Sequence, residues 1–354
     1  MKLSFKNKPN PFYQTLKAKV DAYFEINKLH TAGNSPLYFK GFIHFSTLVL
    51  LYIVLVFFTP SISLSIFCCM LLGLNFATVG FNIMHEGGHG TFSKHSFLNV
   101  LCAYTLNFVG GNAFFWKIKH NINHHTYTNI EGFDPDIDIQ PFLRTSETQP
   151  KLWIHQFQQY YCYFLYGISY FVWVVYDDSV KYFSGSVTPT YHKALTIKNH
   201  LVYWGTKFGY FAFFVGIPSY FVGIVPAIIG YAIMAFTCGL TIAMVFQLAH
   251  VVEATAFPMP NLDGKIENEW AIHQIETTAN FGTKSKFLFW MLGGLNFQVE
   301  HHLFPKISHI HYPALSIIVK ETCDEYGLKY HSYPNAIIAF QSHLKLLANL
   351  GAKN

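Results

Sequence analysis

The stretch MHEGGHG, residues 84–90, places two histidines four positions apart at the end of a long apolar run. Residues i and i+4 share one face of a helix, so His85 and His89 can direct their imidazoles at one point. Neutral imidazole is a common protein ligand for iron, zinc, copper and nickel. The spacing therefore predicts a metal site at the edge of an apolar segment.

Three further groups of histidines have the same character. The segment HNINHHTYTN covers residues 120–129, FQLAH ends another apolar run at residue 250, and NFQVEHHLFP covers residues 296–305. Eight imidazoles exceed what one tetrahedral zinc ion needs, so the set predicts two metal ions with nitrogen-rich surroundings. The candidate ligands are His85, His89, His120, His124, His125, His250, His301 and His302, with Gln298 as a further candidate one helical turn before His301.

Several polar residues near these groups are candidates for orienting the ligand rings. A ligating imidazole usually donates its second ring N–H to a carboxylate, a carbonyl or water. The candidates for this role are Glu86, Asp134, Asp136, Asp138, Glu300, His273 and Asn82. Alternative interpretations stay open for some of them, because the acidic run GFDPDIDI also fits a solvated loop and His273 also fits a polar surface position.

The elements that must position these residues are strongly apolar. Charged residues make up 12% of the 354 residues and aromatic residues 18%, whereas soluble domains carry roughly 25% charged residues. A helix needs about 20 apolar residues to cross a bilayer. Four runs meet this length approximately: 42–59, 61–84, 203–223 and 225–249. The pattern predicts an all-α, multi-pass integral membrane protein with four transmembrane helices in two hairpins.

The distribution of lysines predicts the orientation in the membrane. Seven lysines precede the first apolar run: Lys2, Lys6, Lys8, Lys17, Lys19, Lys28 and Lys40. Basic segments stay on the cytoplasmic side, so 85–200 and 250–354 are expected to form a cytoplasmic helical cap that holds the dimetal site. The chain is then one domain, 1–354, and a bacterial inner membrane suits it. The lysines form no basic stripe interleaved with stacking aromatics, which argues against nucleic-acid binding.

Two weaker apolar runs have a different expected placement. The run 98–116 is interrupted by Asn107, Gly110, Gly111 and Asn112, and the run 158–176 is rich in Tyr and Trp. Aromatic residues of this kind favour membrane interfaces. We expect both runs to lie in the plane of the membrane or to be re-entrant.

Taken in order, HEGGHG, HNINHH and QVEHH resemble the three histidine boxes of membrane fatty-acid desaturases. The glutamine that opens the third box resembles the front-end subgroup, which acts between an existing double bond and the carboxyl end. The resemblance continues through WAIHQIETTANF and HIHYPAL and covers nearly the whole chain. Length and layout are most similar to cyanobacterial delta-6 acyl-lipid desaturases and linoleoyl-CoA desaturase-like proteins.

The resemblance implies an oxidoreductase with two iron ions held by the eight histidines and with dioxygen as co-substrate. An unactivated methylene has no acidic proton, so a metal that activates dioxygen must supply the oxidising chemistry. The implied product is a cis double bond, at delta-6, in an acyl-CoA or a glycerolipid. The sequence has no HPGG motif of a fused haem domain, so we expect electrons from a separate carrier, either ferredoxin or a small haem cytochrome.

Three alternatives remain at this point. Related diiron enzymes with similar boxes hydroxylate acyl chains, and sequence spacing does not separate the two outcomes. HEGGH also fits the HExxH pattern of an intramembrane zinc protease, with Glu86 as general base and Asp263 of the LDG element as third ligand. That interpretation leaves two histidine groups without a role. A histidine-rich metal transporter or sensor would favour ionisable residues near mid-bilayer, whereas these groups lie at the ends of apolar runs.

Overall fold

The computed structural model describes residues 3–5, 11–188, 191–192 and 194–352. Three of the seven N-terminal lysines, Lys2, Lys6 and Lys8, lie outside the described residues. Helices dominate the fold, and the strands form three short two-stranded pairs: β1 with β4, β2 with β3, and β5 with β6.

The α-helices are α1 (Phe12–Ile26), α2 (Ser35–Ile53), α3 (Ile62–Val79), α4 (His85–His89), α5 (Ser96–Ala103), α6 (Thr105–Phe108), α7 (Ala113–Lys117), α8 (His125–Tyr127), α9 (Gln158–Val172), α10 (Asp178–Ser184), α11 (Ile197–Phe211), α12 (Ile217–Val222), α13 (Ile224–His250), α14 (Trp270–Thr277), α15 (Lys286–Met291), α16 (Gln298–Leu303), α17 (Tyr312–Glu325) and α18 (Ala336–Ala352). The π-helical turns are η1 (Val54–Phe58), η2 (Gly80–Met84), η3 (Ile118–His124), η5 (Trp173–Asp177) and η6 (Ala212–Gly216). The 3-10 turns are η4 (Trp153–Phe157) and η7 (His309–His311). The strands are β1 (Ser4–Phe5), β2 (Ser186–Thr188), β3 (Tyr191–His192), β4 (Lys265–Ile266), β5 (Asn280–Phe281) and β6 (Ser332–Tyr333).

Three helices among the described residues are long and apolar enough to cross a membrane: Ser35–Phe58, Ile62–His89 and Ile224–His250. They correspond to three of the four predicted runs. The fourth run, 203–223, lies within the helical stretch α11–η6–α12, which contains the buried Lys207 and is not among the three. Of the four predicted spans, three are therefore confirmed as helices that are long and apolar enough to cross a membrane.

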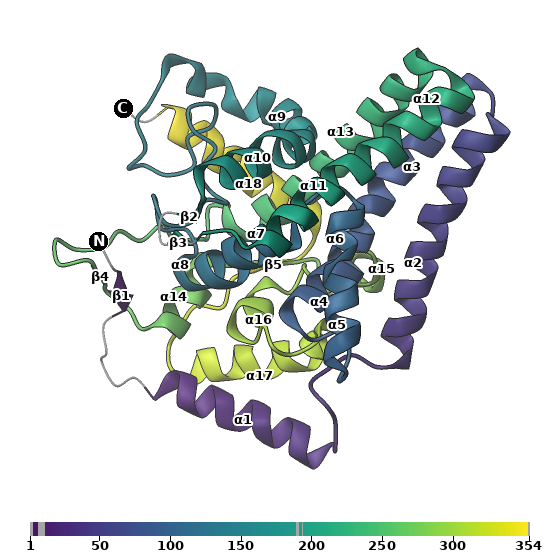
Figure 1. Ribbon diagram of the computed structural model, residues 1–354. Coiled ribbons are helices and arrows are strands. Elements are labelled where there is room, and N and C mark those ends of the chain that lie inside the picture. The colour runs from purple at the N-terminus through teal and green to yellow at the C-terminus, as the bar shows by residue number, and fades with distance from the viewer. Residues whose placement is uncertain (1–2, 6–10, 189–190, 193, 353–354) are drawn as a thin grey trace.

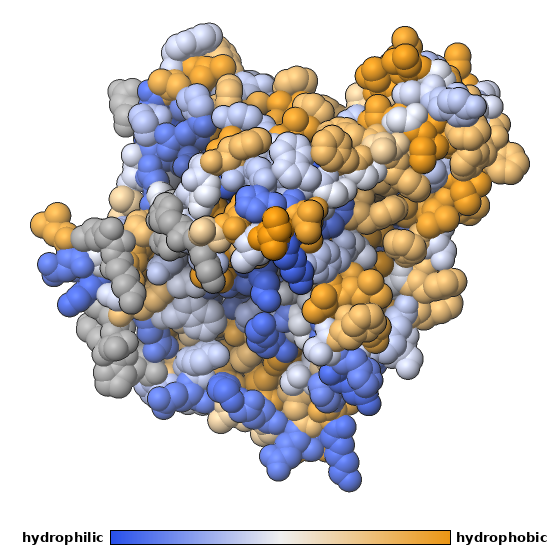
Figure 2. Space-filling view, in the orientation of Figure 1, coloured by the Kyte–Doolittle hydropathy of each residue, from blue (hydrophilic) through white to orange (hydrophobic). Residues whose placement is uncertain are grey.

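The apolar helices extend together from one side of the molecule. In Figure 1, α2 and α3 run toward the upper right beside α12 and α13, and the remaining helices gather to the left and below. Figure 2 shows hydrophobic residues concentrated on this projection, whereas the lower edge near α1 is mostly hydrophilic. The surface thus separates into a lipid-like part and a water-like part.

The region between the two hairpins contains an apolar cavity of about 630 Å³. Its lining includes Tyr52 of α2, Cys69 of α3, Phe214 of η6 and Met234 of α13. None of the histidines in the described part of the chain lines it, so this cavity is separate from the four histidine groups.

Helix α13 is central to the packing, because it contacts α3, α9 and α18. Small residues allow these close approaches. A Cβ at Gly73 would lie 2.3 Å from the carbonyl oxygen of Met234, and a Cβ at Gly239 would lie 2.5 Å from that of Gly167. Membrane helices commonly meet through such small residues. The end of α13, which carries His250, is fixed by these contacts.

The segments around the predicted in-plane runs are short or bent. The run 98–116 forms α5, α6 and α7 with a break at Gly110, whose φ is +91°. The run 158–176 forms α9 and part of η5 and packs along α13. Whether these helices lie in the membrane plane stays a prediction.

We expect Gly239→Ala to destabilise the fold, because its Cβ would meet backbone atoms of α9 rather than a flexible side chain. Overpacking of this kind costs roughly 1–3 kcal/mol. The control is Gly205→Ala on α11, where no heavy atom lies within 4 Å of the added Cβ and alanine is the better helix former. Thermal unfolding in detergent should show a lower Tm for Gly239→Ala only. Equal Tm values for the two variants would refute the packing argument.

Candidate metal centre

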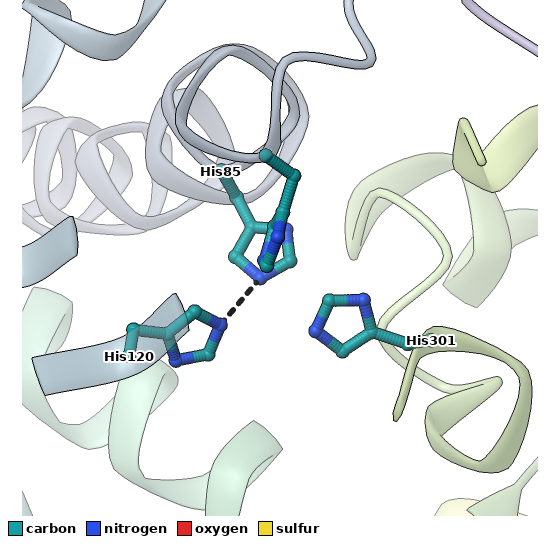
Figure 3. Close-up of side chains that lie close together, drawn as sticks. His85, His120 and His301 are labelled. Atoms are coloured by element: carbon teal, nitrogen blue, oxygen red, sulfur yellow. Dashed lines mark hydrogen bonds between the residues drawn. The ribbon is translucent and has the colours of Figure 1, made fainter. Parts of the chain in front are cut away.

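The first histidine group forms where α4 meets η3 and α16. His85 and His89 end the helix Ile62–His89, and their side-chain nitrogens lie within 4.8 Å of those of His120 and His301. The Nε2 atoms of His85 and His120 are 3.1 Å apart. Figure 3 shows the rings of His85, His120 and His301 turned toward a common space. Four imidazoles from three separate elements therefore share one location.

The two glycines of HEGGH explain why α4 fits this location. A Cβ at Gly87 would lie 2.6 Å from the backbone nitrogen of Ala103 on α5, and one at Gly88 would lie 2.3 Å from the ring of Trp116. The helix is therefore pressed between α5 and the Trp116 ring. Both glycines are needed for packing around the two histidines, a role that the HExxH spacing alone does not show.

A second histidine group lies beside the first. His124, His250 and His302 bring one ring nitrogen each within 4.8 Å of one another, and His125 does the same with His301 and His302. His125 and His301 thus connect the two groups. His120 and His124 have stacked rings 5.3 Å apart, yet His120 reaches the first group and His124 the second. The eight predicted histidines all fall within this connected set.

The outer ring nitrogens of four of the eight histidines are held by hydrogen-bond partners. The Nδ1 atom of His124 lies 3.0 Å from Asp134, that of His302 lies 2.8 Å from the side-chain oxygen of Gln274, and that of His301 lies 3.2 Å from the hydroxyl of Tyr312. His250 contacts the carbonyl oxygen of Thr277 in the same way, at 3.3 Å. This pattern leaves the Nε2 atoms directed inward, as in metal sites whose ligands are oriented by neighbouring groups.

Burial keeps most of these imidazoles neutral. Burial, followed by the neighbouring histidines, lowers the pKa of His120, His125, His301 and His302 well below its usual value. His124 differs, because Asp134 and Asp136 outweigh the opposing effect of burial and raise its pKa. Neutral imidazole is the form that binds metal.

A second observation, independent of the spacing, shows that the ring nitrogens suit a metal ion. The Nε2 atoms of His89, His301 and His302 are buried and have no hydrogen-bond partner among the described residues. Buried polar atoms are normally partnered, and a metal ion would satisfy all three. The histidine groups are therefore compatible with a metal site.

The other predicted site residues occupy varied positions. The Nε2 atom of Gln298 donates to the carbonyl oxygen of Leu295 at 2.9 Å. Asp136 pairs with Lys119 and lies 3.7 Å from the Nδ1 atom of His124, while Asp138 is exposed. Their roles remain proposals.

Asn82 and His273 contact groups other than the eight histidines. The side chain of Asn82 donates to the carbonyl oxygens of Thr78 and Met291. His273 is buried in α14, packs edge-on against Phe5 and belongs to none of the histidine groups. Both positions suit packing, and their roles also remain proposals.

Glu86 and Glu300 bind groups other than the histidine cluster. Glu86 accepts hydrogen bonds from Thr91 at 2.9 Å, from Ser308 at 2.8 Å and from the Nδ1 atom of His309 at 2.8 Å. Glu86 thus ties α4 to the loop that follows the third box. Glu300 accepts from Asn280 and from Tyr330, each at 2.8 Å, and anchors α16.

Sequence reasoning missed several residues that touch the cluster. Gln274 and Tyr312 orient His302 and His301, and Trp116 stacks on His120 with 4.6 Å between ring centroids. Within WAIHQIETT the predicted residue is His273, but it is the neighbouring Gln274 that contacts the candidate ligand His302. The only sequence signal for this contact was that Gln274 is a polar residue next to His273 in the same short helix.

Comparisons with known proteins agree with this arrangement. The family described as fatty acid desaturase matches residues 60–334. The chain belongs to the fatty acid desaturase family. It is 36% identical to the sn-1 linoleoyl-lipid 6-desaturase of Synechocystis sp., covering 96% of this chain and 95% of that protein. It is 35% identical to the protein of the same name from Arthrospira platensis, covering 95% and 92%, and 33% identical to the acyl-lipid (8-3)-desaturase of Physcomitrium patens, covering 96% and 72%.

The family assignment confirms the prediction made from the histidine boxes, that the chain is an oxidoreductase acting as a fatty acyl desaturase of the front-end type. It also decides against the zinc protease and the metal transporter. Asp263, the third ligand required by the protease interpretation, is exposed in a turn and belongs to none of the histidine groups.

The pKa of Glu300 supplies a pH-dependent test of this region. Burial raises the pKa to about 7 from a usual value of 4.5, against the hydrogen bonds from Tyr330 and Asn280. The folded state then holds a proton that the unfolded state has already released, so stability falls as the pH rises through this window. The metal-free protein should lose a few degrees of Tm between about pH 5 and about pH 8, relative to Glu300→Gln. A constant difference in Tm between the two proteins would contradict this assignment.

Proposed function

We propose that this chain is a delta-6 acyl-lipid desaturase that introduces a cis double bond between an existing double bond and the carboxyl end. The observation that carries the proposal is the convergence of eight histidines from four chain segments on one connected set. Two relatives with matching length are named as linoleoyl-lipid 6-desaturases, which favours a glycerolipid over an acyl-CoA as substrate and linoleoyl as the chain.

The proposed membrane arrangement is one domain with four spans in two hairpins and a cytoplasmic cap. The residues Thr59, between α2 and α3, and Gly223, between α12 and α13, both have positive φ. In Figure 1 these two connections lie at the upper right, away from α4 and α16. Helices ending at His89 and His250 bring their histidines to the other end. With the lysine-rich N-terminus in the cytoplasm, that end faces the cytoplasm, in a bacterial inner membrane.

The proposed ligands are the eight histidines, with Gln298 as a ninth candidate, around two iron ions. When bound, the irons would activate dioxygen, which takes two external electrons and removes two hydrogens from the acyl chain. The chain's own residues supply orientation. Asp134, Gln274 and Tyr312 hold the outer ring nitrogens, and burial keeps most of the other rings neutral by lowering their pKa. A separate carrier, ferredoxin or a small haem cytochrome, is the proposed electron source.

The function is tested by expression in a host fed linoleate, with fatty-acid methyl esters analysed by mass spectrometry. The expected result is a new double bond at delta-6. His124→Ala and His302→Ala should abolish this product, while the exposed His95 provides the control His95→Ala, which should retain it. A hydroxylated product would reassign the enzyme to the acyl hydroxylases. Absence of any new product from an inserted, iron-loaded enzyme would refute the proposal.

The two acidic residues Asp134 and Asp138 offer a matched test of the metal centre. Asp134 is fully buried and bonded to His124, whereas Asp138 is exposed on the same loop. Loss of an orienting carboxylate typically weakens metal affinity about 10- to 100-fold. Asp134→Asn should therefore lose iron at limiting metal, measured by plasma mass spectrometry, and Asp138→Asn should retain the iron content of the unaltered enzyme. Equal iron contents would remove Asp134 from the centre.

A further inference from the structure

Lys40, one of the seven N-terminal lysines, lies inside the fold rather than at its surface. It belongs to α2, close to the start of the first apolar helix, and its exposed fraction is 7%. Its Nζ atom lies 5.7 Å from the ring centroid of Phe289 and 5.8 Å from that of Trp290, both on α15. Lysine is almost never fully buried unless it is paired. A group that pairs with this charge must therefore lie close to α2.

The partner of Lys40 is the imidazole of His309 in η7. The Nζ atom of Lys40 lies 3.1 Å from Nε2 of His309, and Nδ1 of the same ring lies 2.8 Å from Oε1 of Glu86. An ammonium group only donates hydrogen bonds, so Nε2 accepts, and the ring proton is on Nδ1, which donates to Glu86. Burial, against the opposing charge of Glu86, lowers the pKa of His309, which suits a neutral ring. A cation and an anion are thus joined through one neutral imidazole.

Glu86 needs this cation because its other hydrogen-bond partners are uncharged. Its carboxylate accepts from the hydroxyls of Thr91 and Ser308 at 2.9 and 2.8 Å, and from the backbone N–H of His309 at 3.0 Å. Glu86 is buried, and among the described residues no lysine or arginine forms a salt bridge with it. A buried carboxylate without a compensating charge strongly destabilises a fold. Lys40 supplies that charge from the far side of the His309 ring.

The same contacts fix the place of the first pair of candidate ligands. Glu86 stands between His85 and His89 in α4, and its carboxylate fastens this helix to η7 and to the loop before it. Lys306 of that loop donates to the carbonyl oxygen of His89 at 3.0 Å, so α4 is attached on both sides of its two glycines. A shift of His309 would therefore move α4, and with it the rings of both histidines.

We propose that Lys40 is a positioning residue for the first histidine group of the metal centre. Through His309 it compensates the buried charge of Glu86, and the anchored Glu86 holds α4 and its two histidines in place. The identity of the bound metal in this inference rests on the proposed function. The coupling between Lys40 and Glu86 does not, because it is a property of the metal-free protein.

Cation–π contact with Phe289 and Trp290 is the competing explanation for the buried lysine. Both rings lie within the roughly 6 Å at which such contacts stabilise a cation. They do not explain why the ammonium group also contacts His309, and they would make the effect of removing Lys40 independent of Glu86. The two explanations therefore differ in whether changes at Lys40 and at Glu86 are coupled.

The first experiment is a double-mutant cycle on the metal-free full chain in nanodiscs, with Lys40→Met, Glu86→Gln and the two changes together. Each single change leaves one buried charge uncompensated, so we expect the Tm to fall by about 5 °C in each single variant. The double variant carries neither charge and should have a higher Tm than either single variant. A double variant that does not exceed both single variants would overturn the proposal.

The matched control is Lys320→Met, at an exposed lysine on α17. This change should leave the Tm as it is in the unaltered protein, and it should not restore the Tm of Glu86→Gln. If Lys40→Met fails to fold, the double variant decides the matter. Its recovery in folded form supports compensation of charge, and its failure to fold overturns the proposal.

The second experiment measures iron binding to the same variants by Mössbauer spectroscopy at limiting iron. Loss of a group that orients metal ligands typically weakens metal affinity about 10- to 100-fold. Lys40→Met should therefore lose one of the two iron signals, the same one that His89→Ala removes, and the double variant should recover most of it. Lys320→Met should match the unaltered protein. Unchanged iron affinity in Lys40→Met would overturn the positioning role, and equal loss of both signals would overturn its assignment to the first group.

The two experiments separate this inference from the proposed function. Unaltered protein that folds but binds no iron would refute the proposed function, while the Tm values of the metal-free variants would still show whether Lys40 and Glu86 are coupled. Both iron signals in every Lys40 variant, together with additive changes in Tm, would refute the role of Lys40 and leave the proposed function intact.

Discussion

The structure depends on burying many imidazole rings without burying charge. A single ionised group removed from water costs several kcal/mol, and eight adjacent histidines could not all be protonated in one place. Burial and mutual repulsion keep most of the rings neutral, which leaves nitrogen lone pairs facing each other. Those lone pairs still need a partner, and the unpartnered Nε2 atoms of His89, His301 and His302 mark where a metal ion would supply it.

The membrane helices serve this constraint by fixing where the rings converge. Two helices that are rigid over more than 25 residues end at His89 and His250, so their terminal histidines meet only if the helices pack at a defined distance. The glycine contacts of α13 with α3 and α9 set that distance. The remaining histidines come from the short helices η3, α8 and α16. The loop that follows α16 is attached to α4 through hydrogen bonds from Ser308 and His309 to Glu86.

Sequence alone predicted the parts of this arrangement that follow from periodicity and residue type. The apolar spans and the eight histidines were evident, because span length and ligand chemistry are local properties. Among the outer partners, Asp134 was one of the predicted candidates and contacts His124, whereas Gln274 and Tyr312 were not predicted. Gln274 and Tyr312 reach the cluster through tertiary packing, and no spacing rule separates Gln274 from the neighbouring His273. The segment 203–223 shows the same limit, since its composition did not reveal that Lys207 would be buried against Asp178 and the carbonyl oxygens of Gly110 and Val174.

The motif HEGGH illustrates how two chemistries can share one spacing. In a zinc protease the glutamate must be free to take a proton from water. Here the carboxylate of Glu86 accepts hydrogen bonds from Thr91, Ser308 and His309 and is fully engaged in holding the third-box loop. The two glycines are occupied by contacts with α5 and Trp116, so the helix offers no open face for a peptide. The same five letters therefore specify an anchored pair of candidate ligands, and the surrounding packing, rather than the spacing, distinguishes this site from that of a zinc protease.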